Sequence, residues 1–145
     1  MDHPLHRVTS FDIRPEDIDV FCKEHGVQLL VLFGSHADGR SHRASDVDLA
    51  MKTRPDAAVS KLDLIFRLGG LFGDREIDLV FLTRDTDPLL LHEIFTKGRL
   101  LHEAQSGIFE SEQLRAWKLY LDTENLRQMQ TTYLRTFVEK MNHVA

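Results

Sequence analysis

One stretch, residues 27–51, constrains this chain more than any other. Val27–Phe33 is a short, almost wholly apolar run of mostly branched residues, which is typical of a buried strand. Gly34 and Ser35 end that run in a turn, where Gly34 allows a close approach of the backbone and Ser35 supplies a hydroxyl and an N–H group. We expect a short helix to begin there, and because the free N–H groups of a helix start favour anions, the turn is a candidate phosphate site.

Two acids, Asp46 and Asp48, follow after ten intervening residues. Side chains alternate along a strand, so both carboxylates are expected on one face. The two carboxylates of such a pair repel each other. Their hard oxygen atoms suit Mg²⁺ or Mn²⁺, ions that also take oxygens from substrate phosphates. The next apolar run, residues 76–82, offers Asp78 as a third carboxylate, either a metal ligand or a general base. Glu76 has the same strand parity and is the competing choice.

Together these residues resemble a known family. The pattern Gly34-Ser35, ten residues, Asp46-x-Asp48 and then Asp78 within Ile-Asp-Leu-Val is similar to the minimal nucleotidyltransferase (MNT) branch of the DNA polymerase β superfamily. The likeness is strongest to MntA-type antitoxins, which are usually paired with a HEPN-domain ribonuclease toxin, and it covers residues 27–104. It implies an α+β (α/β) fold, with a small mixed sheet of about four strands flanked by helices and a C-terminal helical segment.

The resemblance also implies an activity. Proteins of this type transfer AMP from ATP to a tyrosine hydroxyl of the partner toxin and so silence its ribonuclease. On that basis Gly34 and Ser35 hold the triphosphate, and Asp46 and Asp48 bind Mg²⁺, with two ions expected and Mn²⁺ as a substitute. Asp78 then lies near the incoming hydroxyl as metal ligand, base or both.

Residues 36–45 are expected to form a polar loop or short helix over the proposed phosphate site. Arg40 and Arg43 lie in it and are candidate triphosphate ligands, although each could equally be a surface loop residue. His36 and His42 have no cysteine partners nearby, so we interpret both as solvated loop residues rather than as metal ligands.

Composition limits the possible classes of protein. The net charge of −5, without a run of Lys or Arg, argues against direct nucleic-acid binding. The longest apolar stretch is too short to cross a membrane, and the N-terminus lacks the pattern of a secretion signal, which favours a cytoplasmic protein. Cys22 is the one cysteine and is expected in the core. A length of 145 residues predicts one domain, with a nucleotidyltransferase core over about 14–104.

Periodicity and end signals predict the other elements. The pattern Ser60-x-x-Asp63 matches a capping box, but we discount it because it falls inside an apolar periodic segment. The expected elements are a helix from Pro15 that ends at Gly26, a strand over 46–52, a helix over 55–72, a strand over 76–83, a helix over 89–97 with Asp87 as its N-cap, and a strand over 99–103.

The remaining segment, about 109–143, is helical in pattern from Ser111 onward, with a break expected at 122–125. Its apolar stripes have little remaining sheet to cover, so part of the segment is a candidate surface for a homo-oligomer or for a partner protein.

Three functional hypotheses follow. The favoured one is an antitoxin that adenylylates its toxin. The second is a nucleotidyltransferase that acts on a small-molecule hydroxyl, which in this superfamily usually requires a larger helical domain. The third is a non-catalytic antitoxin that neutralises the toxin by binding alone, and the intact acidic motif argues against it.

Overall fold

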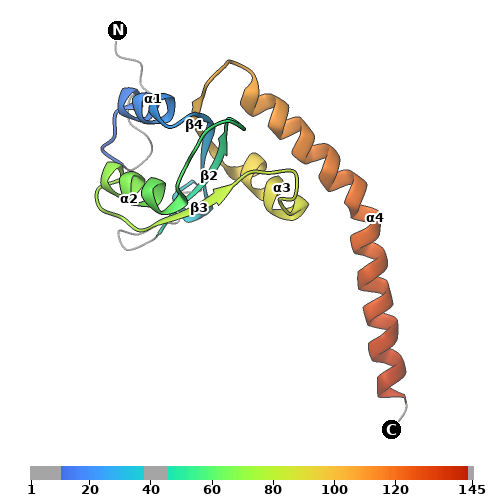
Figure 1. Ribbon diagram of the computed structural model, residues 1–145. Helices are drawn as coiled ribbons and strands as arrows, with labels where there is room; N and C mark the ends of the chain where they lie inside the picture. Colours follow the sequence, from blue (N-terminus) through green and yellow to red (C-terminus); the bar gives the residue numbers. More distant parts are fainter. Residues whose placement is uncertain (1–10, 38–45, 144–145) are drawn as a thin grey trace.

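The structure is a computed structural model that describes residues 11–37 and 46–143 (Figure 1). Within these ranges, no helix is both long and apolar enough to cross a membrane. The elements follow in the order α1 (Pro15–Glu24), β1 (Val27–Phe33), η1 (Gly34–His36, a 3₁₀ turn), β2 (Val47–Thr53), α2 (Lys61–Leu71), β3 (Ile77–Phe81), α3 (Pro88–Lys97), β4 (Arg99–Glu103) and α4 (Ile108–Asn142).

The strands form one four-stranded sheet in the order β3-β2-β1-β4. β1 pairs antiparallel with both β2 and β4, whereas β2 and β3 run parallel. A parallel pair needs a crossover connection, and α2 provides it. The predicted α+β fold, a small mixed sheet flanked by helices, is therefore confirmed.

Helices cover both faces of this sheet, as Figure 1 shows, which explains why β1 is apolar at every position except Gln28. Leu30 and Leu32 pack in a cluster with residues of α1 and α2, and Leu29 and Val31 pack in another with residues of α3 and α4. Cys22 of α1 is fully buried, as predicted. Burial, and then the nearby charge of Asp19, raises the pKa of its thiol to about 12, so Cys22 stays protonated at neutral pH.

The ends of α1 and α3 lie where the sequence signals predict them. Pro15 occupies the first turn of α1. A side-chain oxygen of Asp87 accepts a hydrogen bond from the Leu89 N–H at 2.8 Å, and Gly98 follows the last residue of α3.

The predicted start of α2 at residue 55 is wrong, because the helix begins at Lys61. A turn from Arg54 to Ala57 precedes it, and the Ser60 hydroxyl accepts a hydrogen bond from the Asp63 N–H at 3.4 Å. The Ser60-x-x-Asp63 capping pattern therefore marks the true start of the helix, and discounting it was wrong.

The predicted break at 122–125 is also wrong, because α4 is one continuous helix. No Gly or Pro interrupts this stretch. The Thr123 hydroxyl donates to the Leu119 carbonyl at 2.9 Å, and Arg127 donates to the Tyr120 carbonyl at 3.1 Å while its guanidinium lies over the Tyr120 ring. These contacts keep the polar segment helical.

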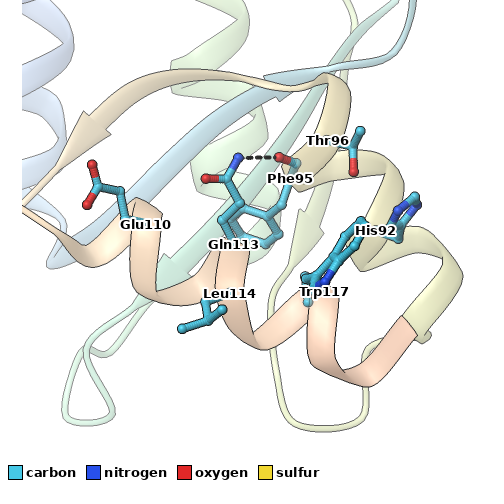
Figure 2. Close-up of a pocket in the computed structure, with 8 residues that line it drawn as sticks. His92, Phe95, Thr96, Glu110, Gln113, Leu114 and Trp117 are labelled. Carbon is cyan, nitrogen blue, oxygen red and sulfur yellow. Dashed lines mark hydrogen bonds between the residues drawn. The ribbon is translucent and has the colours of Figure 1, made fainter. Parts of the chain in front are cut away.

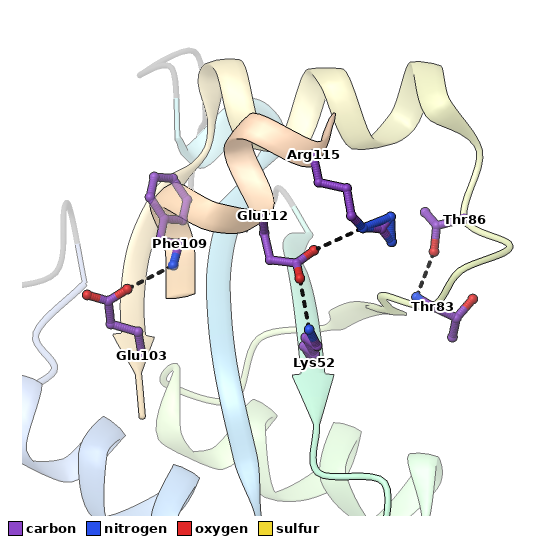
Figure 3. Close-up of polar contacts among 7 residues, drawn as sticks. All are labelled: Lys52, Thr83, Thr86, Glu103, Phe109, Glu112 and Arg115. Carbon is purple, nitrogen blue, oxygen red and sulfur yellow. Dashed lines mark hydrogen bonds and ion pairs between the residues drawn. The ribbon is translucent and has the colours of Figure 1, made fainter. Parts of the chain in front are cut away.

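The start of α4 is tied to the sheet by two polar contacts (Figure 3). The Glu103 carboxylate at the end of β4 accepts a hydrogen bond from the Phe109 N–H at 2.9 Å. Lys52 of β2 forms an ion pair with Glu112 of α4 at 2.8 Å. The first turns of α4 are thus fixed against the core, whereas Figure 1 shows the distal half projecting away from the sheet.

Candidate functional site

The candidate acids converge at the start of two adjacent strands. In the parallel pairing of β2 and β3, Asp48 stands opposite Asp78. Because partners in register project from the same face, their carboxylates are neighbours. The Val47 N–H donates to the Glu76 carbonyl at 2.9 Å and fixes this register at the strand starts. The prediction that Asp78 lies beside the acid pair agrees with this arrangement.

Asp46 lies one residue before β2 and is exposed, as is Asp78, whereas Asp48 is half-buried. Asp46 and Asp48 have the same parity, so Asp46 extends the acidic face beyond the strand start. Glu76 precedes β3 and is also exposed, and its backbone carbonyl bonds Val47. The register thus pairs Asp78, not Glu76, with the half-buried Asp48.

Gly34 closes the site from the side of β1. The antiparallel register pairs Phe33 with Asp48, so the chain leaves β1 directly beside that carboxylate. Gly34 has φ +73°, and a Cβ built there would lie 2.2 Å from Oδ2 of Asp48. Both the backbone angle and the space therefore require glycine at this position.

Ser35 lies in the middle of η1 and is half-buried, so it is part of the same turn. The turn is closed by a hydrogen bond from the Ala37 N–H to the Gly34 carbonyl at 3.1 Å. The acids and the Gly34-Ser35 turn are thus brought together, as their spacing predicts. Arg40, Arg43 and His42 lie outside the described residues, so their predicted roles stay predictions.

The pKa of Asp48 is raised above its ordinary value, first by burial and then by the charge of Asp78 and a hydrogen bond with it. The charge of Asp46 adds to this rise, and His36 opposes it. The site therefore concentrates negative charge in a partly buried place. A divalent cation would relieve that repulsion, and perturbed acids of this kind are typical of functional sites.

The carboxylates of this site are candidate ligands for a Mg²⁺ ion. In the part of the chain that the structure describes, no three or more His, Cys, Asp or Glu side chains are grouped so as to hold a metal. Mg²⁺, however, is usually bound through one or two carboxylates together with substrate phosphates. The adjacent, mutually repelling oxygens of Asp48 and Asp78 fit that mode of binding, with Asp46 beside them.

The interpretation of His36 as a solvated loop residue is wrong, because its side chain is buried. The ring lies 4.9 Å from the Phe11 ring, which packs edge-on against Phe72 at 5.1 Å. His36 also lies close enough to Asp48 to affect its pKa. The sequence gives no signal for this burial, since Phe11 precedes the first expected helix and lies far from His36 along the chain.

Sequence reasoning also missed Arg99 at the start of β4. Its Nε donates to the Ala37 carbonyl at 2.9 Å, so it fixes the residue that follows η1. Arg99 pairs with Leu32 in the sheet, two residues before Gly34. Its position after Gly98 marks a strand start, but only the sheet order brings it next to the Gly34-Ser35 turn.

A separate cavity of about 480 Å³ lies between α3 and α4 (Figure 2). Gln113 spans it with a hydrogen bond from Nε2 to the Phe95 carbonyl at 2.8 Å. His92, Leu114 and Trp117 are among the other residues that line it (Figure 2). None of the candidate acids lines this cavity, so we assign the chemistry to the acidic face instead.

We expect Asp48→Asn to raise the melting temperature by a few degrees at neutral pH without divalent cations. A raised carboxyl pKa in the folded state stabilises the protein below the unfolded pKa, and this stabilisation is lost as pH rises through the folded pKa. Amide substitution removes the repulsion that remains at neutral pH. Calorimetry checks this, and Mg²⁺ should stabilise the wild type more than Asp48→Asn. A lower melting temperature for the variant in metal-free buffer would contradict this account of Asp48.

The fold and the acidic site together define a class, the small α+β domains that carry paired acids beside a Gly-Ser turn. Residues 16–106 match the family described as polymerase beta, nucleotidyltransferase, and the chain belongs to this family. The family predicted by the sequence motif is thereby confirmed.

Individual relatives agree with this assignment. The chain is 32% identical over 80 residues to the protein adenylyltransferase MntA of Shewanella oneidensis, a match over 54% of this chain and 56% of that protein. The chain thus spans about half the length of the curated relative it matches.

Among solved structures, a toxin–antitoxin with AMP-PNP contains a chain with a TM-score of 0.67 and 24% identity, covering 83% of this chain and 98% of that chain. A complex of the tri-AMPylated Shewanella oneidensis HEPN toxin with MNT antitoxin contains a chain with a TM-score of 0.62 and 21% identity. The match covers 83% of this chain and 95% of that chain. At these identities the two structures show the shared fold.

Proposed function

We propose that this protein is a metal-dependent protein adenylyltransferase that acts as an antitoxin. It transfers AMP from ATP to a tyrosine hydroxyl of a HEPN ribonuclease toxin in the cytoplasm and thereby neutralises the toxin. The observation that carries the proposal is the pairing of Asp48 with Asp78 directly beside the Gly34 turn. The relative named as an adenylyltransferase supports the choice of reaction.

Each residue has a role in this proposal. Gly34 and Ser35 hold the triphosphate, and the N–H groups at the start of η1 would favour its charge. Arg40 and Arg43 are proposed as further cations for the phosphates. Asp46, Asp48 and Asp78 hold Mg²⁺, which neutralises charge on the phosphates.

The reaction joins the tyrosine oxygen to the α-phosphorus of ATP and breaks the bond from that phosphorus to the bridging oxygen, so pyrophosphate leaves. Asp78 is exposed at the strand start, where it can accept the hydroxyl proton. Asp48 is half-buried next to it and is held in one place by the Gly34 turn. Fixed positions of this kind carry most of the rate of phosphoryl and nucleotidyl transfer.

A protein acceptor fits an open site. Asp46 and Asp78 are both exposed, so no described element covers these two carboxylates. The core over about 14–104 would carry the chemistry. The helical segment over about 109–143 would offer a surface for a partner protein or for a second copy of the chain.

The test is to incubate the chain with ATP, Mg²⁺ and the product of the adjacent gene, which the proposal expects to be a HEPN toxin. We expect intact-mass spectrometry to show AMP on the toxin, peptide mapping to place it on tyrosine, and ribonuclease activity to fall as the modified fraction rises. Neutralisation without any increase in mass would overturn the catalytic proposal in favour of binding alone. AMP that appears only on small molecules would favour the other enzymatic hypothesis.

A further inference from the structure

The distal half of α4, residues 122–142, carries an apolar surface that no other described element covers. Among the described residues of α4, only Ala116 is buried. Large apolar side chains farther along are between 52% and 72% exposed: Leu126, Met129, Tyr133, Leu134, Phe137, Val138 and Met141. An apolar surface of this extent on a projecting helix marks an interaction site.

The spacing of one stripe on this surface is that of a helix-pairing seam. Successive members are separated by three or four residues, so they share one face of the helix. The stripe consists of Asp122, Leu126, Met129, Tyr133, Phe137 and Lys140. Its two ends carry opposite charges, and its middle is apolar.

This stripe is complementary to itself in the antiparallel direction. If two copies pair about a two-fold axis near Thr131, Leu126 of one copy meets Phe137 of the other, and Met129 meets Tyr133. Asp122 of each copy then lies opposite Lys140 of the other, which gives one attractive pair at each end. A parallel pair would instead place like charges side by side at both ends.

We propose that the distal half of α4 binds a second copy of this chain, forming an antiparallel helix pair centred near Thr131. None of the residues in the stripe belongs to the candidate acidic site. The dimer therefore does not depend on the proposed enzymatic function, and the dimer can be tested in the full chain without ATP or a toxin.

The first test is the mass in solution by light scattering. The wild type should have twice the chain mass of 16.7 kDa, whereas Met129→Glu with Phe137→Glu should give a monomer of unchanged helical content by circular dichroism. Both side chains are exposed in the single chain, so these substitutions do not disturb its core. A monomeric wild type, or a dimer that the double variant leaves intact, would overturn the proposal.

The second test is the direction of pairing. Asp122→Cys mixed with Lys140→Cys should form a disulfide-linked mixed dimer under mild oxidation, while either variant alone should not cross-link. Cys22 is buried and does not interfere. If each single variant cross-links with itself and the mixture contains no mixed dimer, the helices pair in parallel. That result would contradict the antiparallel model. A chain that is monomeric alone and associates only with the added toxin would reject the second copy as the occupant.

Discussion

Replacing Gly34 by alanine should reduce AMP transfer by roughly 100-fold or more, because a displacement of about 1 Å at a reacting group costs on this order. The added Cβ would lie 2.2 Å from Oδ2 of Asp48, so the carboxylate has to rotate away from Asp78 or the turn has to move. At φ +73° the backbone also disfavours any side chain, by about 1–2 kcal/mol. Initial rates of label transfer from ATP measure the effect.

Two other glycines separate these causes. Gly73 has φ +75° with nothing within 4 Å of a built Cβ, so Gly73→Ala carries the backbone strain alone. Gly70 lies within α2, also with nothing within 4 Å, so Gly70→Ala carries neither penalty. We expect transfer to be near wild type in both. If Gly34→Ala transfers AMP as well as Gly73→Ala does, the contact with Asp48 is not part of the site.

Asp78→Asn should lower kcat by roughly 10²–10⁴-fold, the usual contribution of a positioned acid or base, with a smaller change in KM for ATP. Asp78 faces Asp48 across the β2–β3 pairing and is exposed toward an incoming hydroxyl. The amide keeps the shape of the carboxylate but can neither accept a proton nor hold a cation strongly. Steady-state kinetics with varied ATP, at saturating Mg²⁺ and toxin, separate kcat from KM.

Glu76→Gln is the matched control, since Glu76 is the competing acid of the same parity. Glu76 precedes β3, and its contact with Val47 is made by the backbone carbonyl. The substitution leaves that carbonyl in place. We expect nearly wild-type kcat. A large loss of kcat in Glu76→Gln together with an active Asp78→Asn would reverse the assignment of the third carboxylate.

The parts of the fold that local signals specify were predicted correctly. The apolar run Val27–Phe33 forms the central strand, and Asp87 with Pro88 starts α3 as its capping chemistry requires. The Gly34-Ser35 turn and Asp48 were singled out by spacing alone, and the structure brings them together. These features depend on residues close in sequence, so a reading of the chain can identify them.

Features that depend on distant pairings were not predictable in the same way. The parallel register that sets Asp48 opposite Asp78 follows from the crossover through α2, and the link from Arg99 to Ala37 follows from the order of the sheet. His36 is buried because Phe11, far from it in sequence, packs on its ring. The continuity of α4 through Asp122 shows that polar residues without Gly or Pro do not end a solvated helix.

The most direct measurement of the central claim is transfer of radiolabel from α-labelled ATP to the HEPN toxin with Mg²⁺, comparing the wild type with Asp46→Asn, Asp48→Asn. We expect label on the toxin with the wild type, none with γ-labelled ATP, and loss of transfer in the variant although it still folds. Equal transfer by the wild type and the double variant would contradict the account, because the acids beside the Gly34 turn would then not perform the reaction.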